Sequence, residues 1–310
     1  MPLFTQNTAF SYKNSTPTIL IPPSPFNLIF SLTCGQIFGW KQINQGFLGL
    51  IQNNPFFLEQ KGDTLALLNL GGSPLEIDPL QKQLSHFFRW DDDLKKILRS
   101  WRKDPLLSKT AAHFPGLRLI RQDPWDCLVK FLLSICSNIP KIEKTLIRLS
   151  QGAESIISVP FQDPKTKRCF ETQLPVIPSP SVIASIKEEK LRSTGMGFRA
   201  SYLKECSKQI LQGFPLNSLK QKSYSSAKKE LMELPGIGEK VADCVLLFSL
   251  DHPEAFPVDV WMQKILERYY FHGKSKTPKY LSEWGRSHFG NFAGYVQQYL
   301  YHFSRSCLKS

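Results

Sequence analysis

Residues 231–245 read LMELPGIGEKVADCV and place two glycines, two positions apart, between two helical patterns. We expect one helix to end at Leu234 and the next to begin near Glu239, because Gly236 and Gly238 permit a tight turn with close backbone approach. The N–H groups that open the second helix, together with the glycine amides, would bind one phosphate oxygen without touching a base. The pattern predicts a helix-hairpin-helix, although a plain interhelical turn also uses glycines.

Lys240 lies in the first turn of the second helix. The helix dipole disfavours a cation there and favours a neutral, nucleophilic amine. Cys244 and Phe248 follow at i+4 and i+8, so that an amine, a thiol and an aromatic ring share one helix face and could line a flat base. The alternative is a surface lysine that pairs with Asp243 at i+3.

Asp259 ends the apolar run Ala255 to Val258 and occupies an expected helix N-cap. Capping alone would explain an aspartate here. One helix and a return loop separate it from Lys240, which makes a second role credible. Cleavage of an N-glycosidic bond develops positive charge on the sugar, and a nearby carboxylate would stabilise that charge.

The rest of the chain divides into a strand-like and a helical part. Three short apolar runs separated by turn residues predict an antiparallel meander, at 47–51, 56–60 and 64–70. Short helices are expected within 76–115. A core helix should begin at Asp123-Pro124 and carry an apolar face as far as Cys136. Further helices are expected at 141–150, 181–193, 200–212, 225–234, 239–249, 259–270, 278–288 and 292–303. Residues 153–180, rich in Pro and Ser, are predicted to form a loop.

Composition indicates a globular protein with a polyanionic partner. The formal net charge is +13, which favours phosphate-bearing ligands. No run approaches the roughly 20 apolar residues of a membrane span, and the N-terminus does not resemble a signal peptide, so an intracellular protein is expected. The seven cysteines are scattered and include no C-x-x-C pair. Reduced thiols, no metal, no iron–sulfur cluster and no cofactor are therefore expected.

Six motifs, in order, resemble the helix-hairpin-helix DNA glycosylases, and among them the 8-oxoguanine DNA glycosylases of the eukaryotic type. They are CGQIFGW (34–40), LIRQDP (119–124), GMGFRA (195–200), LPGIGEKVADC (234–244), PVDV (257–260) and AGYVQ (293–297). The resemblance implies an α+β fold. An N-terminal antiparallel, twisted β-sheet domain with flanking helices would span 1–118, and an all-α catalytic domain would span 119–310.

The same resemblance implies a bifunctional base excision repair enzyme. Lys240 would attack the anomeric carbon of the sugar, the oxidised guanine would leave, and a Schiff base would permit β-elimination that nicks the strand, with Asp259 assisting both stages.

The resemblance also implies which residues hold the base and the phosphate. The Gly35 carbonyl would accept a hydrogen bond from N7–H of the oxidised guanine, and Gln297 would face the Watson–Crick edge of that base. Cys244 and Tyr301 would stack on its two faces, and Phe248 would line the pocket. The phosphate would be bound by Gly236, Gly238, Lys240 and Val241. Without the resemblance, Gly35 reads as a turn glycine and Gln297 as an exposed polar residue.

Several positions that would read the opposite strand depart from the family pattern. Cys136 stands where the family has asparagine, Lys141 replaces one of two cytosine-reading arginines, and Phe198 replaces the wedge tyrosine. Arg199 remains as the unaltered cytosine reader. Lysine lacks the rigid fork of arginine, so looser discrimination of the opposite base is expected. Two further departures are Trp261 for a phosphate-contacting histidine and Phe248 for a pocket methionine.

Two alternatives remain open. One is a glycosylase of the same superfamily that acts on oxidised pyrimidines or alkylated bases. Cluster-bearing members carry four closely spaced cysteines near the C-terminus, where this chain has Cys307 alone, and alkylpurine enzymes generally lack the lysine. The other is a non-catalytic helix-hairpin-helix DNA-binding module. The expected partner is double-stranded DNA containing oxidised guanine, bound by a monomer, in the cytoplasm of a prokaryote or the nucleus of a eukaryote.

Overall fold

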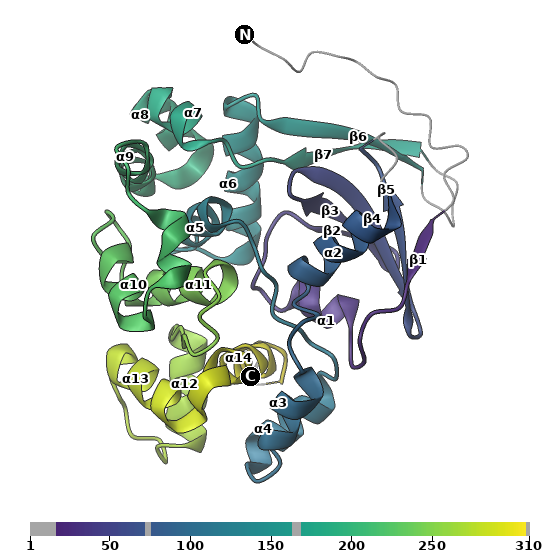
Figure 1. Cartoon of the computed structure of the whole chain (residues 1–310). Coiled ribbons are helices and arrows are strands. Elements are labelled where there is room, and N and C mark those ends of the chain that lie inside the picture. Colours follow the sequence, from purple (N-terminus) through teal and green to yellow (C-terminus); the bar gives the residue numbers. More distant parts are fainter. Residues whose placement is uncertain (1–16, 72–75, 163–168, 308–310) are drawn as a thin grey trace.

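The computed structural model describes residues 17–71, 76–162 and 169–307, and consists of an antiparallel sheet beside a larger helical body (Figure 1). The sheet has five strands in the order β1-β5-β4-β3-β2. Their bounds are β1 Thr18–Leu20, β2 Lys41–Ile43, β3 Gly46–Ile51, β4 Asn54–Lys61 and β5 Thr64–Asn69. The predicted meander is confirmed by β3, β4 and β5, whereas the short edge strands β1 and β2 were not foreseen.

One face of the sheet is covered by two helices, α1 (Leu28–Thr33) and α2 (Ile77–Phe87). Phe47 pairs with Leu58, and Leu58 with Leu67, so that these three side chains form one buried row across the sheet. Leu84 of α2 packs on the same cluster. The central strands β3 and β4 are buried on both faces, because neighbouring residues such as Phe57 and Leu58 point to opposite faces and belong to separate buried clusters.

The helices confirm the predicted α+β class. They are α3 Leu94–Ser100, α4 Pro105–His113, α5 Pro124–Leu133, α6 Ile139–Gly152, α7 Pro180–Ser185, α8 Glu188–Leu191, α9 Arg199–Leu211, α10 Tyr224–Leu231, α11 Glu239–Ser249, α12 Val260–Tyr269, α13 Pro278–Phe289 and α14 Ala293–Cys307. The core helix begins as expected, with the Asp123 side chain capping α5. It ends at Leu133, however, and Cys136 is exposed in a left-handed turn with φ of 48°. The expectation that Cys136 continues the core face is thus wrong.

Residues 153–180 are not the loop that their proline and serine content predicts. Two strands, β6 Ile156–Gln162 and β7 Cys169–Pro175, pair antiparallel and extend from α6 towards the sheet (Figure 1). Val159, Phe161 and Leu174 are buried against sheet residues that include Leu48 and Phe57. The alternating apolar positions find a surface to bury against, and this outweighs Pro160, which a two-stranded ribbon tolerates.

The segment that joins sheet and helices is fixed by buried polar side chains. Gln36 donates to the carbonyls of Ser31 and Arg118 at 2.8 Å, and its Oε1 accepts from the Ile120 amide at 3.0 Å. These bonds hold the chain that follows α1 against residues 118–120. The boundary at residue 118 stays a prediction, since the β6–β7 hairpin of the second part packs on the sheet of the first.

The sequence predicts no membrane span, no metal site and no disulfide, and the described residues bear on all three. No helix there combines the length and apolar character needed to cross a membrane. Within the same ranges, no three His, Cys, Asp or Glu side chains gather as a metal site would require. The seven cysteines are free thiols.

Candidate active site

The glycine-rich stretch forms a turn between α10 and α11 (Figure 1). The first helix ends at Leu231, three residues before the expected Leu234, and residues 232–234 form a turn. Gly236 has φ of 77°, and a Cβ on it would lie 2.4 Å from Cδ2 of the Tyr202 ring. Gly238 is the N-cap of α11 and has open space around it. No side chain within the described ranges caps the first amides of α11, which leaves them available to an anion.

Asp243 does not pair with Lys240, so the alternative that Lys240 is a surface lysine paired with Asp243 is wrong. The Asp243 carboxylate is fully buried and accepts from the Tyr224 hydroxyl at 2.6 Å, from Lys228 Nζ at 3.0 Å and from the Ser282 hydroxyl at 3.0 Å. Lys228 also lies 2.5 Å from a Glu239 carboxylate oxygen. This network ties α10 and α13 to α11 and leaves the Lys240 amine directed elsewhere.

Lys240 projects towards the end of α5. Its Nζ donates to Ser134 Oγ at 3.1 Å and lies 5.0 Å from the centroid of the Phe131 ring. The Ser134 hydroxyl in turn donates to the Phe131 carbonyl at 2.6 Å. The packing of α5 against α11 therefore sets the direction of the amine, and the lysine has no carboxylate within ion-pair distance among the described residues.

Asp259 caps α12 through one of its two carboxylate oxygens. Oδ1 accepts from the amides of Trp261 at 3.1 Å and Met262 at 2.9 Å. No hydrogen bond to Oδ2 occurs within the described chain, so the second oxygen is available to face a substrate. The cap orients the carboxylate, which makes the structural role and the proposed chemical role compatible.

The charges of Lys240, Asp259 and Arg305 act on the side chains of Cys244 and Tyr301. Burial raises the pKa of the Cys244 thiol to about 12, Lys240 opposes this shift, and Asp259 adds to it. Burial also raises the pKa of the Tyr301 phenol to about 12, with Arg305 opposing and Asp259 adding. Lys240, Cys244, Asp259, Tyr301 and Arg305 thus form one electrostatic cluster. The Cys244 thiol is neutral at physiological pH, which suits a stacking surface and not a nucleophile.

The Gly35 loop faces the same cluster. Gly35 has φ of 87°, and a Cβ on it would lie 2.8 Å from Arg305 Nη1 and 3.1 Å from Tyr301 Cε1. The preceding carbonyl, that of Cys34, accepts from Gln298 Nε2 at 2.9 Å. The loop is consequently anchored to α14, and a side chain at position 35 would fill space needed by its neighbours.

Gln297 and Phe248, two further residues of the expected pocket, are buried like Cys244. Gln297 is 5% exposed, and its Oε1 has no hydrogen-bond partner among the described residues. A buried amide oxygen without a partner calls for an explanation, and a ligand donor would supply one. Phe248 is 2% exposed and stacks on Phe131 at 5.4 Å between centroids. Phe248 therefore packs against the Phe131 ring and exposes almost none of its own ring to solvent.

The residues expected to read the opposite strand lie next to the Ser134 turn. Phe198 is 48% exposed and meets the Tyr202 ring edge-on at 5.8 Å. Arg199, by contrast, is buried and donates to four backbone carbonyls, those of Leu133, Ile135, Gly195 and Met196. Cys136 lies close enough to influence the Arg199 guanidinium. Lys141 is exposed at the start of α6. These contacts use four of the five N–H groups of the guanidinium, which leaves one N–H for a base.

Trp261 opens α12, directly after Asp259. Lys264 Nζ lies 5.5 Å from the centroid of the Trp261 ring, and the Trp261 carbonyl accepts from the Ser304 hydroxyl at 3.3 Å. The residue therefore sits between the Asp259 cap and α14, and the phosphate contact made by a histidine in the family stays untested for this tryptophan.

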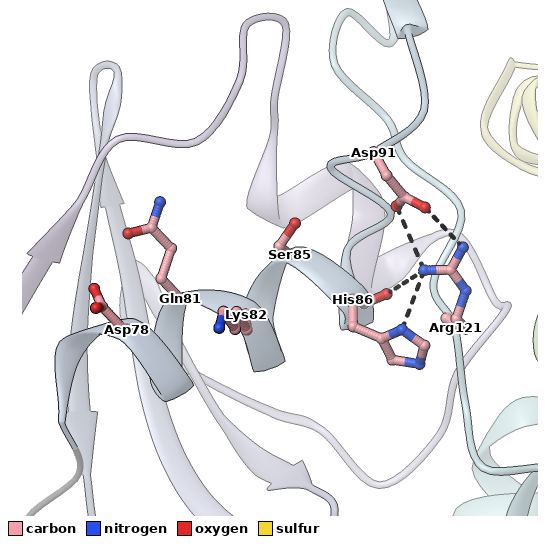
Figure 2. A pocket seen from close by; sticks show the side chains of 7 residues that line it. All are labelled: Asp78, Gln81, Lys82, Ser85, His86, Asp91 and Arg121. Carbon is pink, nitrogen blue, oxygen red and sulfur yellow. Dashed lines mark hydrogen bonds and ion pairs between the residues drawn. The ribbon is translucent and has the colours of Figure 1, made fainter.

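A separate cavity of about 500 Å³ runs along α2 (Figure 2). Its lining includes Asp78, Lys82, Asp91 and Arg121. Figure 2 shows the Arg121 guanidinium between Asp91 and His86. It lies 3.2 Å from the Asp91 carboxylate and donates to the His86 carbonyl at 3.0 Å. None of the expected site residues lines this cavity, and Arg121 is already paired with acidic side chains, so the cavity is separate from the expected site.

Sequence reasoning missed two residues of the site. Ser134 follows the core helix and carried no motif. Arg305 lies beyond the expected end of the last helix at 303, whereas α14 continues to Cys307. A signal was present for Arg305, because Gln297, Tyr301 and Arg305 are spaced by four and share one helix face.

Comparison with protein families matches both parts of the chain. Residues 18–128 match a family described as "8-oxoguanine DNA glycosylase, N-terminal domain". Residues 156–287 match the "HhH-GPD superfamily base excision DNA repair protein" family. The two matches follow one another along the chain, in the order that the motifs predict.

Individual relatives match over nearly the whole length. The N-glycosylase/DNA lyase OGG1 of Arabidopsis thaliana is 31% identical, over 94% of this chain and 81% of its own. A probable N-glycosylase/DNA lyase of Methanothermobacter thermautotrophicus is 27% identical, over 92% and 95%. Among solved structures, the Clostridium acetobutylicum 8-oxoguanine glycosylase/lyase in complex with double-stranded DNA superposes with a TM-score of 0.81 and 27% identity, over 90% and 92%. The chain belongs to the 8-oxoguanine DNA glycosylase family of the HhH-GPD superfamily.

Proposed function

We propose that this protein excises 8-oxoguanine from duplex DNA and then nicks the strand at the resulting site. The observation that carries the proposal is the cluster in which Lys240, Cys244 and Asp259 meet the Gly35 loop and Tyr301. Membership of the family supports the substrate, and the relatives that match over most of the chain are named N-glycosylase/DNA lyase.

The geometry supports Lys240 as the nucleophile. The neutral amine would attack C1′ of the flipped nucleotide, the C1′–N9 bond would break, and the base would leave with the bonding electrons and take up a proton. Opening of the sugar would give a Schiff base between Nζ and C1′. Loss of a proton from C2′ would then expel the 3′ phosphate, and water would release the enzyme from the product.

Asp259 would act on the sugar side of the same site. The oxygen that does not cap α12 can stabilise the positive charge that develops as the glycosidic bond breaks. The exposed amides at the start of α11, with Gly236, Gly238 and Val241, would hold a phosphate near Lys240. Phe198, at the exposed turn before α9, would fill the gap left by the flipped base.

Duplexes that differ in one nucleotide test this proposal. Purified protein should cleave strands that carry 8-oxoguanine opposite cytosine, and a preformed abasic site, while leaving undamaged DNA intact. Cleavage of oxidised-pyrimidine or alkylpurine duplexes in place of 8-oxoguanine would support another glycosylase of the superfamily. Binding of all duplexes without cleavage of any would support a DNA-binding module and contradict the proposal.

A further inference from the structure

Three side chains line up along one face of α14 in consecutive turns: Gln297, Tyr301 and Arg305. The first two are positions to which the family resemblance assigns a base contact. Arg305 is the third member of the row, and no role is assigned to it. It is partly exposed, as a side chain at the mouth of a pocket would be.

Arg305 reaches the Gly35 loop directly. Its Nη1 lies 2.8 Å from the point where a Cβ on Gly35 would stand, and its guanidinium carbon lies 5.4 Å from the centroid of the Tyr301 ring. The guanidinium therefore occupies space between the residue expected to read N7–H and the residue expected to stack on the base. Any base that enters must displace it, and a long flexible side chain can be displaced at low cost.

The charge of Arg305 is not neutralised within the described chain. None of the ion pairs found there includes it. Its neighbour in the pocket is the Tyr301 phenol, which is neutral because burial raises its pKa to about 12. Asp259 also acts on this phenol but forms no ion pair with Arg305 among the described residues. A guanidinium without an ion-pair partner can take a further acceptor, and the carbonyl oxygen of a ligand would provide one.

The oxidised edge of 8-oxoguanine offers that acceptor. Oxidation turns N7 from an acceptor into an N–H donor and places a carbonyl oxygen, O8, on the adjacent carbon. If the Gly35 carbonyl accepts from N7–H, a donor beside Gly35 stands next to O8. Undamaged guanine has a C–H group at this place and an acceptor at N7, so it matches neither partner.

We propose that Arg305 is a specificity-determining residue that yields its place to the flipped base and then donates a hydrogen bond to O8. Gly35 and Arg305 would together read the oxidised edge as a donor and acceptor pair. This inference rests on the proposed function and adds a base contact to it.

Binding in a cleavage-inactive background separates this role from a phosphate contact. In Lys240→Gln protein, Arg305→Ala should raise the Kd for an 8-oxoguanine:cytosine duplex about tenfold and leave the Kd for the guanine:cytosine duplex unchanged. Equal weakening for both duplexes would make Arg305 a backbone contact and overturn the proposal, as would no change for either. Arg305→Gln and Arg305→Lys give the same comparison if the alanine variant does not fold.

The rate of base excision by the active protein provides a second test of the Arg305 contact. Arg305→Ala should slow single-turnover excision of 8-oxoguanine about tenfold, while cleavage of a preformed abasic site, which has no base to contact, keeps its rate. Tyr301→Phe is the matched control, because it removes the hydroxyl near Arg305 and keeps the stacking ring. If Tyr301→Phe reproduces the Arg305→Ala defect, Arg305 acts through Tyr301 and the direct contact is refuted. Wild-type protein that cleaves neither substrate would refute the proposed function itself, whereas an active wild type with an unaffected Arg305→Ala refutes only this inference.

Discussion

Lys240 Nζ donates a hydrogen bond to Ser134 Oγ at 3.1 Å, which joins the hairpin helix α11 to the end of α5. The lysine stem has several rotatable bonds, and this contact selects the rotamer that points the amine at the cluster around Cys244 and Asp259. The candidate nucleophile is thus positioned by a residue that lies over a hundred positions earlier in the sequence.

Removal of that contact should slow the chemistry without unfolding the protein. We expect Ser134→Ala to reduce the single-turnover excision rate about tenfold, because an unoriented amine attacks less often. The matched control is Ser137→Ala, whose buried hydroxyl has no hydrogen-bond partner among the described residues and should not change the rate. An unchanged or faster rate for Ser134→Ala would show that the hydroxyl does not orient Lys240.

Arg199 should prove to be a structural residue in the free protein. Its guanidinium donates to four backbone carbonyls in bonds that are buried or partly buried. Arg199→Ala would leave these acceptors without their donor, at a cost of about 3 kcal/mol in the free energy of unfolding. Urea denaturation measures this cost, with the exposed Arg268→Ala as the control expected to change stability by less than about 0.5 kcal/mol. A loss at Arg199 as small as that of the control would mean that the carbonyl contacts contribute nothing.

The two hairpin glycines should respond differently to alanine. Gly236→Ala forces a Cβ into the Tyr202 ring and a side chain into the left-handed region, so we expect destabilisation of about 1–3 kcal/mol together with weaker DNA binding. Gly238 has extended backbone and open space, so Gly238→Ala should keep the stability of the wild type. Thermal unfolding compares the two variants, and equal loss in both would contradict the geometry described for the turn.

Stability should fall in mildly acidic solution because of His302. Burial, with a smaller contribution from Arg305, lowers the pKa of His302 from 6.5 to about 4, and its ring packs 4.3 Å from that of Phe114. The unfolded chain then binds the proton more readily, so the stabilisation is complete above pH 6.5 and is lost as the pH falls towards 4. The loss is on the order of 2 kcal/mol. His302→Gln should flatten the dependence of unfolding free energy on pH in this window, and an unchanged slope would contradict the assignment.

The sequence predicted the hairpin, the sheet and most helices because their signals are local. Glycines at 236 and 238, the Asp123 cap and the apolar runs of residues 47–70, separated by turn residues, each specify nearby structure. The β6–β7 hairpin was missed because Val159 and Phe161 gain their partners from a sheet far away in the sequence. Ser134 was missed for the same reason, since only the packing of α5 against α11 brings it to Lys240. Arg305 was missed because the last helix was expected to end at residue 303, although its spacing from Tyr301 was a local signal.

Covalent trapping tests the central claim, that Lys240 is the nucleophile. With borohydride present, protein incubated with an 8-oxoguanine:cytosine duplex should form a stable protein–DNA adduct as the Schiff base is reduced, and Lys240→Gln should form none. Lys95→Gln, which removes one exposed positive charge on α3, is the control that should keep the adduct. A trapped adduct in Lys240→Gln protein, or none in the wild type, would contradict the account.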